Sequence, residues 1–349
     1  MKRFLLYSIC FLLAQNFSAQ TQLGTTMNGA VAGDLFGAFV SISSNGNRYV
    51  VGSSDNTISS AFGGYARVYD YNGSAWNVLG ADIAEEVNGD NAGAVAISGD
   101  GSRIIIGGYL NDGNGTDSGH VRVYQWNGSA WTQVGADING EAAGDNSGVS
   151  VSISSNGSVI AVGAHNNDGN GANSGHVRVY AWNGSAWVQR GVDLNGEAAS
   201  DNFGVALSMS QDGTKLAVGA RYNDAGGSNA GHVRVFNWNG SSWVQMGADI
   251  DGFQVDMAFG SAVSISNTGT RVAIGTPLYN GTIGDQGIAR VYNYNGSSWS
   301  QIGQDIIGWS GTSGTNLGKS ISISGDGNAI VVGSSGYSGG GSTFRGLAE

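Results

Sequence analysis

The feature that most constrains this chain is an internal repeat. Its clearest mark is an aromatic-Asn-Gly-Ser-Ala/Ser-Trp string, whose successive copies begin 55, 56, 56 and 56 residues apart. The five copies are Tyr71–Trp76, Trp126–Trp131, Trp182–Trp187, Trp238–Trp243 and Tyr294–Trp299. Repetition at a fixed period outweighs any local signal, because each unit folds alike and buries its apolar faces against its neighbours.

One module, considered in detail, predicts four short antiparallel strands. From Ser147 the residues alternate in polarity as far as Asn156-Gly157, which we expect to form a type I′ hairpin turn. Residues 159–163 return as an almost wholly apolar strand, typical of a strand covered on both faces. A polar loop then leads to a strand at residues 177–180, and Asn183-Gly184 turns the chain into a fourth strand.

Four antiparallel strands per repeat predict an all-β fold, a β-propeller of four-stranded blades stacked around an axis. A flat β-solenoid is the alternative, but its coils are usually shorter. Gly makes up 61 of 349 residues and only 12% are charged, which disfavours helices and argues against helical bundles and doubly wound nucleotide-binding folds. The blades are expected to start near residues 34, 90, 145, 201, 257 and 315.

Six blades are expected, five of them complete. The sixth has two clear strands near its start and a weak candidate for a third at Thr343–Arg345. The segment Gln22–Gly29 resembles Gln133–Gly140, an outer strand elsewhere, so we expect it to complete the sixth blade and close the ring. Closure of this kind hides strand edges that invite aggregation. A seven-bladed parent truncated at its C-terminus is the alternative.

The N-terminus predicts secretion. Lys2 and Arg3 precede an apolar run from Phe4 to Ala14 and then a polar segment containing Ser18 and Ala19, the pattern of a secretory signal peptide cut near Ala19 or Gln20. We expect residues 1–20 to be removed and residues 21–349 to form one propeller domain, in the extracellular space, the periplasm or at the cell surface. The run is too short to span a bilayer comfortably, so no transmembrane segment is expected.

The charge balance limits the partners. The net charge is −11, with only 15 Lys and Arg and no basic run, so neither nucleic acid nor an anionic membrane has an electrostatic footprint. The expected partner is an extracellular protein or a polysaccharide, bound by a monomer.

The Phe-Gly openings at Phe203-Gly204 and Phe259-Gly260, together with strands such as Ala161–Ala164 and Ala217–Ala220, resemble FG-GAP repeats. The resemblance covers roughly residues 21 to 335 and implies a β-propeller like the heads of integrin α chains. Those repeats carry an Asp-rich calcium loop between the first two strands of several blades. Here a tight hairpin with few carboxylates occupies that position, and calcium by analogy is not implied.

A different loop, after the second strand, recurs with Asp and Asn in three modules. Calcium takes six to eight oxygen ligands, and these Gly-rich loops offer several. The candidate ligands are Asp112, Asn114, Asp117, Asp168, Asn170 and Asp224. The alternative is a turn in which Asp and Asn bond their own backbone, since each loop has only one or two carboxylates.

The Trp pairs of the hairpins are candidate glycan-binding residues. Exposed, they would form one sugar-stacking platform per blade and bind multivalently. The residues are Trp126, Trp131, Trp182, Trp187, Trp238 and Trp243. The alternative, favoured by their identical placement, is that they are cross-strand pairs packed between blades.

Arg and His also recur in register. The third-strand arginines, from Arg67 to Arg290, are expected to pair with nearby aspartates such as Asp137, Asp193 and Asp249. The equivalent residues His120, His176 and His232 precede three of them. Tyr65 and Ile288 replace His in the first and fifth modules, and this variation favours a packing position over a shared metal site.

No catalytic motif is present, and the nearly identical loops argue against a specialised blade, so no enzyme is expected. The sequence predicts a secreted, non-enzymatic propeller that serves as a binding, adhesion or surface-interaction scaffold. A calcium-assisted, multivalent lectin is the first alternative, and a glycan-processing enzyme is a more distant one.

Overall fold

The computed structural model describes residues 22–30, 34–54, 64–87, 89–282, 284–309, 314–336 and 347–348. Within these ranges the chain consists of strands, turns and loops without helices, so none of its segments is a helix long and apolar enough to cross a membrane. The expected signal peptide, residues 1–20, and the candidate strand at 343–345 lie outside the described residues.

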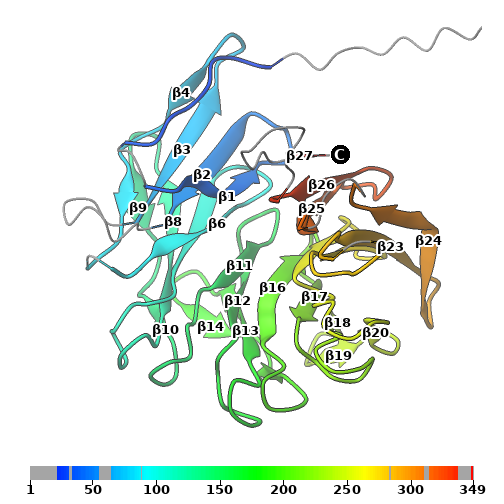
Figure 1. Cartoon of the computed structure of the whole chain (residues 1–349). Coiled ribbons are helices and arrows are strands. Elements are labelled where there is room, and N and C mark those ends of the chain that lie inside the picture. The colour runs from blue at the N-terminus through cyan, green and yellow to red at the C-terminus, as the bar shows by residue number, and fades with distance from the viewer. Residues whose placement is uncertain are drawn as a thin grey trace, which may run out of the picture.

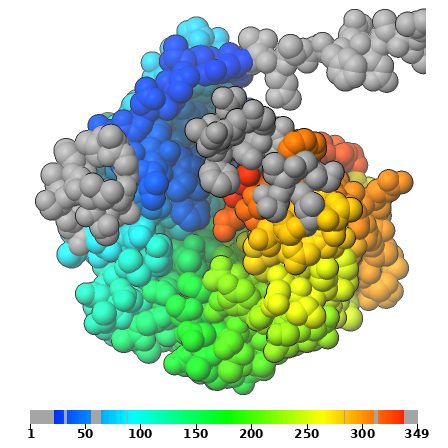
Figure 2. Space-filling model, viewed as in Figure 1, coloured from blue at the N-terminus to red at the C-terminus, as the bar shows by residue number. Residues whose placement is uncertain are grey.

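Six antiparallel sheets follow one another along the chain and surround a common axis (Figure 1). The first two blades contain β1 (Phe36–Ile42), β2 (Arg48–Ser53), β3 (Tyr65–Tyr71), β4 (Trp76–Val78), β5 (Ile83–Ala84), β6 (Ala92–Ile97), β7 (Arg103–Gly108), β8 (His120–Trp126), β9 (Trp131–Gln133) and β10 (Ile138–Asn139). The next two contain β11 (Ser150–Ile153), β12 (Val159–Ala164), β13 (His176–Trp182), β14 (Trp187–Gln189), β15 (Leu194–Asn195), β16 (Phe203–Met209), β17 (Lys215–Ala220), β18 (His232–Trp238), β19 (Trp243–Gln245) and β20 (Ile250–Asp251). The last two contain β21 (Ala262–Ile265), β22 (Arg271–Thr276), β23 (Ile288–Tyr294), β24 (Trp299–Ile307), β25 (Leu317–Ile323), β26 (Ile330–Ser334) and β27 (Leu347–Ala348). The predicted all-β propeller is confirmed, and the blades form successive sectors of the molecule (Figure 2).

In the first four blades the outer strand is broken into two short pieces that both pair with the third strand. In the second blade Trp131–Gln133 and Ile138–Asn139 form these pieces, with Gly135 at a φ of 79° between them. A Cβ at Gly135 would lie 2.9 Å from Trp187 and 3.0 Å from Trp182 of the next blade. Glycine is therefore required both by the left-handed backbone and by the indole rings that close over it.

The hairpin turns differ from the predicted type I′ geometry, which needs positive φ at both central residues. Gly157 has a φ of 69°, but Asn156 is not among the residues with positive φ. Asn156 instead accepts a hydrogen bond from the Ser158 amide through its side chain, as Asn183 does from the amides of Ser185 and Ala186. The prediction was wrong because the Asn side chain caps the turn, and its backbone does not take the positive φ of a type I′ turn.

Neighbouring blades pack through the outward side chains of each inner strand. Leu207 and Met209 of β16 lie in one apolar cluster with Val177 and Val179 of the preceding blade. A series of backbone hydrogen bonds also links the hairpins between the first two strands, from Ser44 to Gly99 and onward to Gly325. The core of the molecule is thus a set of blade boundaries, each made by two consecutive modules.

The boundary between the sixth and first blades is different. Val40 of β1 is 68% exposed, whereas Leu207 at the same register position is 9% exposed. Val331 of β26 is also exposed. Nevertheless, inner strands of all six blades, from Val40 in β1 to Ile321 in β25, line one central cavity of about 660 Å³. The six blades therefore share one axis, but in the described part of the chain this last boundary is packed more loosely than the others.

The N-terminal segment takes the position of an outer strand only in part. The Trp76 indole donates to the Leu23 carbonyl, as the Trp131 indole donates to Leu79. Residues 22–29 thus lie against the first blade where a preceding blade's outer strand would lie. They are not in strand conformation, and the described strands of the sixth sheet are β25, β26 and β27.

Candidate functional site

The predicted sugar-stacking tryptophans lie at the blade boundaries. Trp126 and Trp131 are directly opposite each other, with ring centroids 5.5 Å apart, and both are half-buried. In each pair the second indole donates to a carbonyl of the preceding blade, at 2.8–2.9 Å. The pairs therefore connect consecutive blades, and all six indoles are half-buried there.

One of these boundaries is hollowed. A groove of about 380 Å³ lies between Trp182 and Trp238 and is also lined by Val188, Gln189 and Arg190. The Arg190 guanidinium stacks on Trp238, 4.7 Å from the ring centroid. Indole faces beside polar side chains are suited to an amphipathic ligand such as a sugar.

The predicted calcium ligands have local hydrogen-bond partners. Asp112 accepts the Asp117 amide at 2.8 Å, and Asp168 and Asp224 accept the equivalent amides of Asn173 and Asn229. Asn114 donates its side-chain amide to the carbonyls of Gly140 and Glu141, and Asn170 does the same one blade later. These residues shape the loop and attach it to the linker between blades, so calcium binding by them stays a prediction.

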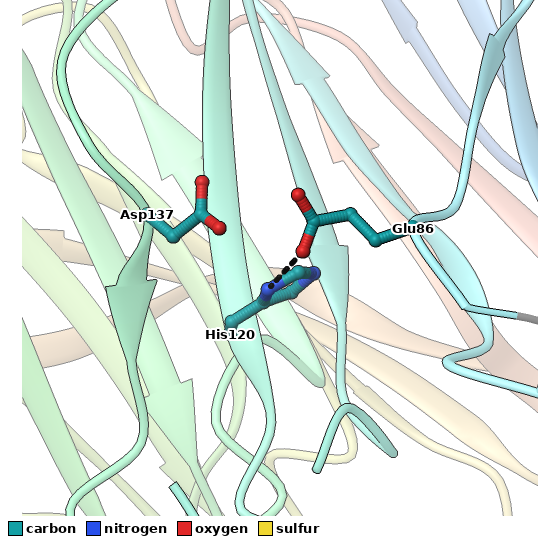
Figure 3. Close-up of side chains that lie close together, drawn as sticks. All are labelled: Glu86, His120 and Asp137. Atoms are coloured by element: carbon teal, nitrogen blue, oxygen red, sulfur yellow. Dashed lines mark ion pairs between the residues drawn. The ribbon is translucent and has the colours of Figure 1, made fainter. Parts of the chain in front are cut away.

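A different set of side chains meets at the same end of the blades. Glu86 lies on the linker from the first to the second blade, His120 opens β8, and Asp137 directly precedes β10, which pairs with β8. Their carboxylates point toward each other across the His120 imidazole (Figure 3). One ligand atom from each residue lies within 4.8 Å of the other two, and the arrangement recurs twice. The equivalent groups are Glu141, His176 and Asp193, and Glu197, His232 and Asp249.

The imidazoles are almost completely buried. His120 and His176 are 1% exposed and His232 is 0% exposed. Each Nδ1 lies 3.7–3.9 Å from the nearest glutamate oxygen, which is too far for a direct hydrogen bond. Burial, reinforced by Arg178 and Arg234, lowers the pKa of His176 and of His232 to about 4. These imidazoles are therefore neutral at pH 7 and have a lone pair to offer.

Both carboxylates are held in place by other groups. Gln133 donates to Oδ1 of Asp137 at 2.6 Å, and the same contact recurs in the third and fourth blades. Arg122 lies 3.5 Å from Oε1 of Glu86, and its Nη2 donates to the Ala84 carbonyl. One oxygen of each carboxylate is thus engaged, which leaves the other directed toward the imidazole.

The expected pairing of Arg122, Arg178 and Arg234 with Asp137, Asp193 and Asp249 was wrong. These guanidiniums lie beside Glu86, Glu141 and Glu197 instead. The predicted pairing does occur in the first and fifth blades, where Arg67 binds Asp82 and Arg290 binds Asp305 through two contacts each, at 2.6–2.8 Å. Those two blades carry Tyr65 or Ile288 in place of His, and Ala30 or Phe253 in place of Glu. The arginine therefore forms an ion pair with the aspartate only in the blades that lack the glutamate.

The first copy of the cluster opens into a cavity of about 520 Å³. Glu86, Asp90, Asp112, His120 and Asp137 are among the residues that line it. The predicted loop residues Asp112 and Asp117 thus share a cavity with Glu86 and Asp137, which lie 20 or more residues away from them in the sequence.

Sequence reasoning noticed the histidines but missed the glutamates. Glu86, Glu141 and Glu197 occur only in modules that also carry His, a correlation visible in the printed sequence. The register alone does not show that a linker residue of one blade reaches the third strand of the next.

The comparison with solved structures supports the fold through one match with a TM-score above 0.5. One solved structure, the complex of KlAtg21 with the coiled-coil of AgAtg16, matches with a TM-score of 0.54 and 10% identity, over 84% of this chain and 76% of that one. TolB from Acinetobacter baumannii matches with a TM-score of 0.45 and 14% identity; 77% of this chain is covered, which spans 55% of the TolB chain. A search of curated proteins found no match.

The comparison with family models concerns the central blades. Residues 139–180 and 195–236 match the family model described as FG-GAP repeat. They run from the linker glutamates into the third strands of the third and fourth blades, the segments that hold Glu141, His176, Glu197 and His232. The resemblance inferred from the Phe-Gly openings is thereby confirmed for these two segments: the chain is a β-propeller with FG-GAP repeats at residues 139–180 and 195–236.

Proposed function

We propose that this protein is a secreted, non-enzymatic scaffold that binds an extracellular protein or polysaccharide through one end of its blades. The observation that carries the proposal is the threefold copy of a single polar surface. The second, third and fourth blades present the same linker glutamate and the same exposed loop aspartate, Asp112, Asp168 or Asp224, and each aspartate accepts the equivalent backbone amide of its loop.

Repetition of this kind suits a ligand that itself repeats or is broad. A ligand held at one blade reaches the next at a high effective concentration, so modest contacts add up to firm binding. The surface is acidic, which favours ligands with cationic or cation-bridged groups. Secretion and the absence of catalysis are parts of the proposal and rest on the N-terminal sequence and on the likeness of the loops to one another.

The test is binding of the purified protein to arrays of glycans and of cell-surface proteins. The informative variant replaces Asp112, Asp168 and Asp224 by Asn, which removes three charges and keeps the acceptor for each turn. Its matched control replaces Asp100, Asp212 and Asp326 by Asn; these aspartates cap hairpins at the opposite end of the blades. We expect binding to fall at least tenfold in the first variant only. Equal binding by both variants would show that this end of the blades is not the binding surface.

A lectin is the second candidate, favoured by the groove between Trp182 and Trp238. Val188 lines the groove and is exposed, whereas Val192 is exposed and is not among its lining residues. Val188→Lys is therefore expected to abolish sugar binding on the same array, and Val192→Lys to preserve it. Sugar binding that tolerates Val188→Lys would exclude this groove as the site.

A further inference from the structure

The proposed binding surface includes the linker glutamates, but it gives no role to the buried histidines of the Glu-His-Asp clusters. We propose that each is a site for a divalent transition-metal cation of zinc type, so that the chain binds three ions, one at each boundary from the first to the fourth blade. The ligands are Nδ1 of the histidine, Oε2 of the glutamate and a carboxylate oxygen of the aspartate, with water completing the coordination.

The buried imidazoles provide the main argument. Nδ1 of His120 and Nδ1 of His232 are buried and make no hydrogen bond. Leaving a buried polar nitrogen unpaired costs about 1–3 kcal/mol, so its repetition needs an explanation. Both nitrogens are directed at carboxylates of their own clusters, at 3.8–3.9 Å. A ligand placed between these atoms would satisfy them.

The distances fit a bridging ion. Zinc lies about 2.0–2.2 Å from nitrogen and oxygen ligands, so two of its ligands are separated by no more than about 4.3 Å. The spacings of 3.7–3.9 Å between Nδ1 and glutamate oxygen fall within that limit. One neutral imidazole with two carboxylates is a donor set for zinc and its neighbours, whereas calcium prefers oxygen ligands alone.

The carboxylates of each cluster are oriented by neighbouring side chains, as the ligands of a metal site usually are. Gln133 holds the far oxygen of Asp137, and Arg122 lies beside the far oxygen of Glu86. Outer contacts of this type orient metal ligands and fix which lone pair faces the ion. The cavity beside Glu86 and Asp137 gives an ion and its water a route to the first cluster.

The charges balance. Around His176 lie Glu141, Asp145 and Asp193, with Arg178 as the facing cation. Their formal sum is −2, which a divalent cation neutralises. In the fifth blade, where His and Glu are absent, Arg290 donates to both carboxylate oxygens of Asp305. Neither oxygen is then left unpaired to bind a metal ion. The described residues thus provide an internal comparison. Three boundaries have a Glu-His-Asp cluster, and at the corresponding positions of the first and fifth blades an arginine pairs with the aspartate instead.

The experiment is a zinc titration of the full protein after dialysis against EDTA, followed by calorimetry and elemental analysis. We expect three ions per chain. Glu86→Gln keeps the side-chain shape and should bind two, and the combined Gln variants at Glu86, Glu141 and Glu197 should bind none while remaining folded by circular dichroism. Asp305→Asn changes the fifth-blade counterpart of the cluster aspartates, at a boundary without the Glu and His, and should still bind three.

A second measurement needs no variant. The chain has four histidines, and His165 belongs to none of the clusters. Zinc should shift the imidazole NMR signals of His120, His176 and His232 and leave those of His165 unchanged. Folded protein that binds no zinc, ions that persist in the triple Gln variant, or equal shifts of all four imidazoles would each overturn the proposal. So would binding of calcium in preference to zinc at the three glutamates.

Discussion

The fourth and fifth blades contain the same arginine and aspartate in the same register and use them differently. In the fifth, Arg290 binds Asp305 with two contacts of 2.8 Å. In the fourth, Arg234 lies beside Glu197 and donates to the Asn195 carbonyl, so that Asp249 faces His232. Two substitutions, Glu197 to Phe253 and His232 to Ile288, separate the two arrangements.

The difference shows that the backbone of a repeat can stay the same while two side-chain positions determine which ion pairs form at a blade boundary. The glutamate draws the arginine away from the aspartate, and the histidine fills the vacated space with a buried imidazole. Neither substitution alone would assemble the cluster. This explains why the two residues occur together in three modules and are both absent from the first and the fifth.

The largest expected difference between the blades with His and the fifth blade is in how their contribution to stability depends on pH. The pKa of His176 and of His232 is about 4, below the roughly 6.5 of an exposed imidazole, so the unfolded state binds more protons. This contribution to stability is complete above about pH 6.5 and is lost as the pH falls toward 4, at about 3 kcal/mol per histidine. Ile288 of the fifth blade contributes nothing to it.

Urea unfolding in EDTA, at intervals from pH 7 to pH 4, measures this loss. The groups facing His176 are Glu141, Asp145, Asp193 and Arg178, and all four are also present in the double variant His176→Gln and His232→Gln, which is the control. The double variant His176→Gln and His232→Gln should therefore lose several kcal/mol less than the wild type over the same range. An identical decline in both proteins would mean that the imidazoles are not buried in neutral form.

Removing the arginine should have a smaller effect that depends on the blade. Arg178→Met leaves the buried Asp145, the half-buried Asp193 and the exposed Glu141 without their facing cation and should cost about 3 kcal/mol in EDTA. Arg290→Met breaks a partly exposed pair and should cost about 1 kcal/mol. Zinc should restore part of the first loss, because a dication replaces the guanidinium, and none of the second. Unfolding midpoints with and without zinc test this; equal costs and equal rescue would contradict it.

The smallest expected change, a single additional ion, and the sharpest test of the comparison come from converting the fifth blade. Phe253→Glu with Ile288→His reproduces the residues of the fourth blade, and should raise the zinc stoichiometry from three to four. Phe253→Glu alone should leave it at three, because the imidazole is missing. A double variant that folds and still binds three ions would show that further residues of the boundary are needed.

Much of the architecture was predictable, because it depends on local patterns repeated many times. Alternating residues before Asn156-Gly157, apolar returns such as residues 159–163, and Trp-bearing hairpins each indicate a strand or a turn on their own. Repetition then excluded most other ways of combining them. The type I′ turns were mispredicted because an Asn side chain caps the turn. An Asn-Gly pair in the sequence is compatible both with this capping and with a left-handed backbone at Asn, and does not distinguish them.

The candidate site was predictable only in its parts. His120, Asp137 and Arg122 were singled out, but the pairing of the arginine with the aspartate was wrong for the second, third and fourth blades. The decisive partner, Glu86, comes from the linker of the preceding blade and lies 34 residues before His120. Contacts across a blade boundary depend on how two sheets stack. A strand pattern in the sequence carries no information about the distances between side chains of neighbouring sheets.

By itself the sequence determined that this protein is all-β, built of repeated four-stranded units, acidic, and without a catalytic motif, because periodicity and composition act locally and in every copy. Only the tertiary structure decided which side chains meet at the boundaries, which arginines are diverted from their aspartates, and where the ring is loosely packed. The physical reason is that burial and Coulomb interactions depend on distances through space, and those are set by the stacking of neighbouring blades.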